Sequence, residues 1–253
     1  MGAYVEHSTW DMVREKLVQG FVPVLPVAAA CKEHGFHMPM NTDQLQIDWL
    51  LSRVMHRNIL AWPALTYGYY PAFKNYAGSV TLSRKTFVAV VSEIVDGIFI
   101  HGADRLIILN SGISTISPLV ELSLSQQYLG RVHLCNIYHG QNFIDAERKV
   151  SEQGSGGHAD EIETSIMLVA SHSRVNMSLA HPSSTRVYSD GPLQAADPVS
   201  PNYSESGVMG NPVLANAEKG RILTDAMCRD VDHFIQHVVQ SRQKHSDMID
   251  EST

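Results

Sequence analysis

The sequence lacks any long apolar run and any block of charges of one sign. No stretch approaches the ~18 to 20 consecutive apolar residues that a membrane-spanning helix needs. The first residues, MGAYVEHSTWD, have neither the basic start nor the apolar middle of a signal peptide. The net charge of −7 is spread along the chain, which argues against nucleic acid or a membrane as a partner. We therefore expect a soluble, cytoplasmic protein that acts on a small molecule.

Cysteine is also scarce. The three cysteines, Cys31, Cys135 and Cys228, are odd in number and widely spaced, which excludes a disulfide framework and a paired-cysteine metal site. The content of 44% hydrophobic and 18% charged residues is typical of a globular protein. We expect the 253 residues to form a single domain, with about 1–15 and 241–253 peripheral or frayed.

Apolar stretches alternate with amphipathic ones along the chain. The apolar stretches predict buried strands at 21–30, 59–65, 104–110 and 132–138. The amphipathic stretches predict helices at 43–56, 84–101, 118–128, 158–170 and 217–239. Thr42 and Ser83 are the expected N-caps of the first two helices. Such alternation favours a three-layer α/β/α domain with a mostly parallel sheet, which binds ligands beyond the carboxyl ends of its strands.

The loop after the first expected strand is the densest polar stretch, AAACKEHGFHMPMNTDQ at 28–44. His34, His37 and Asp43 are residue types that hold a divalent zinc or manganese ion, although His37 could equally be a loop histidine bound to a backbone carbonyl. Lys32 stands among them as a cation with no lone pair for a metal. Glu33 follows it and, in extended chain, points to the opposite side.

Two other loops carry candidate substrate-binding groups. Tyr67 and Tyr69 belong to an aromatic loop that could line a pocket or pack between subunits. Ser111, Ser114 and Thr115 lie in the turn NSGIST, whose backbone amides and hydroxyls could form an anion cradle.

Several ordered motifs, from about residue 20 to 240, resemble the creatininase (creatinine amidohydrolase) family. In that family the first strand ends in Gly-Ser-x-Glu-Gln-His-Gly-x-His-x-Pro-x-x-Thr-Asp, and AAACKEHGFHMPMNTD places six residues in register: His34, Gly35, His37, Pro39, Thr42 and Asp43. YGYYPAFKNYAGSVTLS resembles the family's Tyr-Gly loop, and GGHADEIETSIML resembles its His-Ala-x-Glu-x-Glu-Thr-Ser helix start. The resemblance implies the α/β/α fold, a metal-dependent hydrolase of cyclic or acyclic amides, and a homo-oligomer with a hexamer as the expected size.

The resemblance also implies a two-metal site, and this sequence departs from it. The family takes a glutamate, a histidine and an aspartate from the first motif, and a histidine and often an acidic residue from a later turn. Here Lys32 stands at the glutamate position, while Gly112 and Ser114 stand at the positions in the turn. Only His34 and Asp43 remain. An ammonium about 4 Å from a dication adds repulsion of several kcal/mol, so we do not expect a conventional dinuclear centre.

Three interpretations of the site stay open. In the first, His34, Asp43 and one of His37, Glu33 or Glu163 hold a single zinc or manganese ion that activates water. In the second there is no metal, and the site works through its own side chains. The third is a binding or assembly protein that has kept the fold without the chemistry.

The metal-free interpretation assigns distinct roles to the polar residues. Lys32 holds a substrate oxyanion or, if burial lowers its pKa, attacks a carbonyl to form a Schiff base, while His158 or Glu163 moves protons. A lyase or isomerase would use the same groups. Glu161 and Glu163 cannot share one helical face, and the family pattern favours Glu163 as the inward residue. Our leading prediction is an amidohydrolase for a small amide, lactam or related carbonyl compound.

Overall fold

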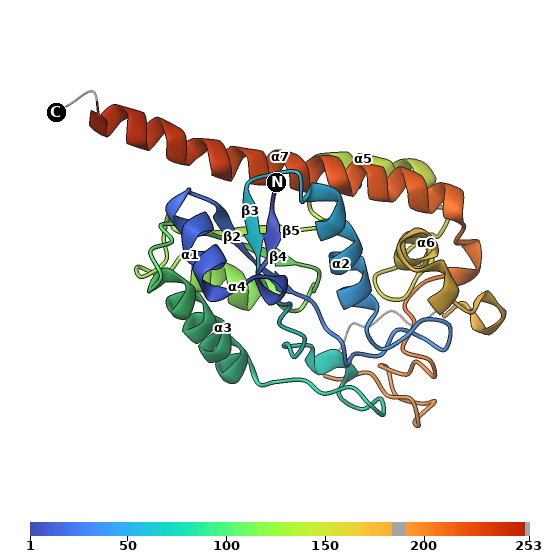
Figure 1. The fold of residues 1–253 in the computed structure, drawn as a ribbon. Coiled ribbons are helices and arrows are strands. Elements are labelled where there is room, and N and C mark those ends of the chain that lie inside the picture. Colours follow the sequence, from blue (N-terminus) through green and yellow to red (C-terminus); the bar gives the residue numbers. More distant parts are fainter. Residues whose placement is uncertain (184–190, 251–253) are drawn as a thin grey trace.

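The fold comes from a computed structural model that describes residues 1–183 and 191–250, with side chains up to 241 (Figure 1). Its centre is a five-stranded parallel sheet in the order β1-β3-β2-β4-β5. The strands are β1 (Ala3–Tyr4), β2 (Val22–Val27), β3 (Ile59–Ala61), β4 (Leu106–Asn110) and β5 (Val132–Asn136). The predicted three-layer α/β/α arrangement with a parallel sheet is confirmed.

Helices cover both faces of the sheet. One face carries α1 (Trp10–Val18), α3 (Arg84–Phe99) and α4 (Ile116–Ser123), and the other carries α2 (Thr42–Val54), α5 (Gln141–Val150), α6 (Glu161–Ala170) and α7 (Ala217–Asp250). Side chains alternate along the central strands, so Ile107 and Leu109 of β4 face the second group while Ile108 faces the first. Among the described residues, no helix combines the length and apolar character needed to cross a bilayer.

Several element boundaries differ from the sequence-based expectation. Ser83 caps α3 as predicted, its hydroxyl accepting from the Thr86 N–H. Thr42 is instead the first residue of α2, and its hydroxyl donates to the Pro39 carbonyl. The helix expected from Pro118 begins at Ile116, because a proline in the first turn lacks only an N–H that would have no helical partner.

Three elements were not predicted. β1 and α1 occupy the N-terminal segment, where β1 pairs with β3 at the sheet edge. α5 was also missed, although Phe143, Ala146 and Val150 give it a buried stripe with helical spacing. The last helix continues to Asp250, beyond the expected end at 239, and residues 240–250 contain no Gly or Pro that would end it. Residues 251–253 of the tail expected to fray, and 184–190 of the long segment after α6, lie outside the described residues.

Candidate active site

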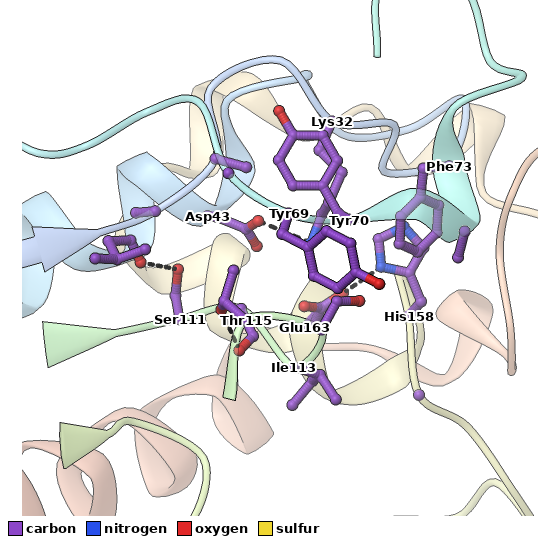
Figure 2. A pocket seen from close by; sticks show the side chains of 18 of the residues that line it. Lys32, Asp43, Tyr69, Tyr70, Phe73, Ser111, Ile113, Thr115, His158 and Glu163 are labelled. Carbon is purple, nitrogen blue, oxygen red and sulfur yellow. Dashed lines mark hydrogen bonds and ion pairs between the residues drawn. The ribbon is translucent and has the colours of Figure 1, made fainter. Parts of the chain in front are cut away.

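A cavity of about 140 Å³ opens at the carboxyl edge of the sheet, where the loops after β2, β3 and β4 meet the start of α6 (Figure 2). This is the edge at which parallel sheets bind ligands. The predicted site residues that line it are Lys32, Asp43, Tyr69, Ser111, Ser114, Thr115, His158 and Glu163. Four distant stretches of sequence therefore converge on one small space.

Lys32 projects into this cavity from the loop after β2. Its Nζ lies 2.7 Å from Asp43 Oδ2, and only 6% of the residue is exposed. Its ammonium also lies 5.5 Å from the centre of the Phe73 ring. Burial alone would lower the pKa of Lys32, but Asp43, Glu163 and Glu33 raise it overall, so the side chain stays protonated. The Schiff-base role considered from the sequence is therefore disfavoured.

Asp43 joins Lys32 to His34. Its Oδ1 lies 3.1 Å from His34 Nε2, while His34 Nδ1 lies 3.0 Å from the Lys32 carbonyl oxygen. Both nitrogens of this buried imidazole thus face acceptors, a pattern that an imidazolium or a bound cation satisfies. Burial would raise the pKa of Asp43, but Lys32 and His34 hold it well below its usual range.

His158 is the centre of a second ion-pair chain. Its Nε2 lies 2.8 Å from the Glu33 carbonyl oxygen and 3.1 Å from Glu33 Oε2, and its Nδ1 lies 3.5 Å from Glu163 Oε2. Burial disfavours a charged imidazole, yet Glu33 and Glu163 raise the pKa of His158 overall. The ring packs 4.2 Å from Phe73 and 4.8 Å from His34, measured between ring centres. The Lys32–Asp43–His34 group and the Glu33–His158–Glu163 group are therefore in contact through the two imidazole rings.

Local backbone chemistry fixes the start of α6. Asp160 caps the helix, with Oδ1 accepting from the N–H groups of Ile162 and Glu163. Ala159, between His158 and Asp160, has φ +48°, a conformation that costs free energy without glycine. Its N–H donates to Glu163 Oε2 over 2.6 Å, which turns that carboxylate toward the cavity.

Glu161 lies on another side of the same helix. It is fully buried and pairs with Lys219, away from the cavity. It also accepts from the N–H groups of Glu152 and Gln153. Its environment is a structural ion pair, as expected for the outward member of the Glu161 and Glu163 pair.

The turn after β4 folds on itself. Thr115 Oγ1 lies 2.6 Å from Asn110 Oδ1 and 2.8 Å from the Gly112 carbonyl oxygen. Ser111 is buried and its Oγ lies 3.4 Å from the Val27 carbonyl oxygen. A Cβ added at Gly112 would lie 2.5 Å from Thr115 Oγ1, so a larger residue at position 112 would clash with the Thr115 side chain. The Thr115 hydroxyl is committed within the turn rather than offered to an anion.

The remaining predicted residues are less central. Tyr67 is 48% exposed and does not line the cavity, unlike Tyr69 and its neighbour Tyr70. His37 is buried behind the cavity, with Nε2 2.8 Å from Thr164 Oγ1 and Nδ1 without a partner among the described residues. Burial lowers the pKa of His37 to about 4, so it is neutral near pH 7.

Several lining residues were not proposed as site residues from the sequence, among them Ile113, Gly157 and Met209. Ile113 sits one residue from the predicted turn positions, a proximity that could have indicated it. Met209 reaches the site through backbone pairing with His158, a contact that the sequence does not signal.

Three of these groups are placed where a cation could bind. His34, His158 and Glu163 each offer one ligand atom, and these atoms lie within 4.8 Å of one another. This set shares His34 and the candidate Glu163 with the mononuclear site suggested by the sequence, and it has His158 where the sequence suggested Asp43. Asp43 has one oxygen on Lys32 and the other facing His34, and His37 is directed at Thr164.

The fold and site define an α/β/α protein with a buried cluster of carboxylates, imidazoles and one ammonium at the sheet's ligand-binding edge. The family model for creatininase, described as creatinine amidohydrolase, matches residues 6–235. The chain belongs to the creatininase family. This assignment, with the relative described next, supports a hydrolase of C–N bonds.

Individual relatives agree with this assignment. Creatinine amidohydrolase from Pseudomonas putida is 25% identical over 254 residues, covering 92% of this chain and 96% of that protein. A manganese creatininase structure has a TM-score of 0.79 at 23% identity, covering 94% of this chain and 99% of its own. A mutant creatininase of the Zn-Zn type has a TM-score of 0.76 at 24% identity, covering 93% and 98%. At these identities the solved structures establish the likeness of fold.

Proposed function

We propose that this protein is an amidohydrolase for a small amide, lactam or related carbonyl compound, working at a reorganised site that takes at most one divalent ion. The observation that carries the proposal is the Lys32 ammonium, buried in the cavity and 2.7 Å from Asp43. A cation built into the chain occupies the site where the family resemblance implies a metal-binding carboxylate.

Charge balance sets the limit on metal content. The cluster combines three basic and three acidic side chains: Lys32, His34 and His158 with Glu33, Asp43 and Glu163. With both imidazoles protonated, its net charge is zero. One dication that displaced the two imidazole protons would keep that zero, whereas a second would leave two uncompensated positive charges in a buried site.

A single ion therefore fits the donor set of His34, His158 and Glu163. When bound, it would supply Lewis acidity toward water or a carbonyl oxygen. The manganese and zinc forms of solved creatininases support zinc or manganese as the ion to test. Protonation of both imidazoles would balance the same charges without any ion, which is equally consistent with a metal-free enzyme.

Lys32 is the proposed electrophilic group. An ammonium has three N–H donors, and Asp43 is the partner at bonding distance, which leaves donors for a ligand in the cavity. A substrate carbonyl oxygen placed there would gain charge as water attacks its carbon. A preorganised cation in a buried site stabilises such an oxyanion.

Glu163 is the proposed proton-transfer group in the metal-free form. Its carboxylate lines the cavity and can take a proton from water as the water oxygen bonds to the carbonyl carbon. The same proton then passes to the leaving nitrogen as the C–N bond breaks, giving an acid and an amine. His158 holds Glu163 in place, and Glu33 orients His158 from the other side. These two are positioning residues.

Metal analysis combined with a substrate screen tests the proposal. Protein purified without chelators should hold zero or one equivalent of zinc or manganese, and it should hydrolyse members of a panel of small amides and lactams. Lys32→Met should abolish that turnover. Lys219→Met, which removes a second buried lysine outside the cavity, is the matched control and should keep it.

The outcomes separate the remaining alternatives. Activity that survives chelation supports the metal-free form, while activity lost on chelation and restored by one equivalent supports the mononuclear form. Two tightly held equivalents would contradict the charge limit. A folded protein that turns over no panel member but binds one saturably would favour a non-catalytic member of the family. Homo-oligomerisation, with a hexamer as the expected size, belongs to the same proposal, and sedimentation velocity would measure it.

A further inference from the structure

A second cavity, of about 210 Å³, lies beside the first and shares part of its wall. Ile113, Gly157 and Glu163 line both. A third cavity, of about 390 Å³, shares Glu147, Gly157 and Asp160 with the second. The three spaces therefore meet around Gly157 and lead from Lys32 to the exposed glycine-rich loop before α6. A ligand that extends from the first cavity past Gly157 would enter the second.

The second cavity differs from the first in its chemistry. Its described lining includes three carboxylates, Glu147, Asp160 and Glu163, against one imidazole, His139, and no lysine or arginine. Tyr138 and Phe143 add an aromatic wall, with their rings edge to face and 5.5 Å apart. Carboxylates and aromatic faces together favour a cationic ligand group.

The carboxylates contribute in different ways. Asp160 already accepts three hydrogen bonds, from two backbone N–H groups and from Gln153 Nε2, so it supplies charge rather than a free acceptor. Glu147 is only partly buried on α5 and stands where the second and third cavities meet. It is the carboxylate best placed to contact an incoming cation directly.

We infer that the second cavity is the subsite for the amine half of the substrate, and that this half carries an ammonium or other cationic group. The inference rests on the proposed hydrolase function. The carbonyl oxygen faces Lys32 in the first cavity, the scissile nitrogen lies beside Glu163 on the shared wall, and the cationic end reaches Glu147. Opposite charges at the two ends thus fix the direction in which the amide lies.

Binding of amine fragments tests the subsite without requiring turnover. Calorimetry compares butylamine, which is cationic at neutral pH, with butan-1-ol, a neutral molecule of equal length. The amine should bind at least about tenfold more tightly to the native protein. Glu147→Gln should remove much of that preference by weakening the amine alone. Glu93→Gln, an exposed carboxylate on α3 that lines none of these cavities, is the control and should change neither affinity.

Two further variants test the position of the subsite. Ile113 is 58% exposed, and a Cβ at Gly157 would meet only Met209 Cε at 3.9 Å, so larger side chains can be placed at both positions without disturbing the core. Ile113→Trp and Gly157→Leu should each weaken butylamine binding by about tenfold or more if the amine occupies the space that they narrow. Equal binding of amine and alcohol, or amine binding that neither obstruction changes, would overturn the inference.

A turnover comparison separates this inference from the proposed function. The substrates are the N-butyl and N-(4-aminobutyl) amides of one small acid, and the aminobutyl amide should have the higher kcat/KM. Lys32-dependent hydrolysis with no preference for the amine would leave the hydrolase proposal standing and overturn the subsite. Amine-selective binding with no hydrolysis of any amide would support the subsite and contradict the proposed hydrolase function.

Discussion

Replacing Lys32 by methionine removes the cation that neutralises Asp43. At 2.7 Å and an effective dielectric of about 20, the attraction between the two charges is on the order of 6 kcal/mol. Desolvation of both groups offsets part of this. Breaking one side of a buried pair nevertheless costs about 3–5 kcal/mol, because the other charge is left without a partner. We expect Lys32→Met to lower the free energy of unfolding by that amount.

A double-mutant cycle measures the same interaction. Asp43→Asn alone should also destabilise the protein, because it leaves the Lys32 ammonium unpaired. The double variant, Lys32→Met with Asp43→Asn, should lose less than the sum of the single variants, with a coupling energy of about 2 kcal/mol or more. Urea unfolding near neutral pH, followed by circular dichroism and analysed with the m-value for each variant, provides the free energies.

The refuting result is specific. Lys32→Met within about 1 kcal/mol of the native protein, or single-variant losses that simply add, would mean that the ammonium and the carboxylate are not a buried pair. The proposed limit of one divalent ion would then lose its main support. Lys219→Met should also destabilise the protein, because it breaks the Glu161 pair, but it should leave ligand binding at the cavity unchanged.

Three other predictions concern the same region. Lys32→Glu makes the net charge of the cluster more negative by two units, so without metal the variant should be less stable than the native protein. Added zinc or manganese should stabilise the variant more than it stabilises the native protein, by about 2.7 kcal/mol at a hundredfold excess over Kd. Thermal unfolding with and without the ion measures both effects. Ala159→Val should lower the free energy of unfolding by more than about 1 kcal/mol, because only glycine accepts φ +48° without strain. For the same reason Ala159→Gly should have a free energy of unfolding within about 1 kcal/mol of the native value. Similar urea midpoints for the two variants would contradict this. The pKa of His158 is raised in the folded state, so its charge contributes stability that is fully present below the unfolded pKa of about 6.5 and lost as pH rises through the folded pKa. The difference in the free energy of unfolding between the native protein and His158→Gln should therefore narrow from about pH 5.5 to pH 9, as measured by urea unfolding. A difference that widens over this range would be inconsistent with the raised pKa.

Much of the fold was predictable because its signals are local. Apolar runs such as LIILN mark strands buried on both faces, and the hydroxyl of Ser83 marks a helix start through its own backbone neighbours. The predicted element boundaries were wrong where the sequence signal for a helix was weak or was shared by neighbouring positions. Thr42 and Asn41 are both acceptable caps, and the short polar helix α5 has only three buried residues. The alternation of strands and helices along the sequence predicted which edge of the sheet holds the site. It did not predict which side chains meet there.

Glu33 shows the limit for the site. Its position beside Lys32 indicates that the two side chains diverge, and of the two only Lys32 lines the cavity. No sequence rule states that Glu33 then meets His158, which is 125 residues away, at 3.1 Å. A hydrogen bond over that separation depends on how α6 packs against the loop after β2.

The sequence by itself determined the α/β/α class, the family, and the presence of Lys32 at the position where the resemblance implies a metal-binding carboxylate, because composition, periodicity and motif order are properties of the chain. The tertiary structure decided which charges pair. It placed Lys32 against Asp43 and His158 between Glu33 and Glu163, and it turned Glu161 away to Lys219. Electrostatic energy depends on distance and burial, and both are set only when segments far apart in the chain pack together.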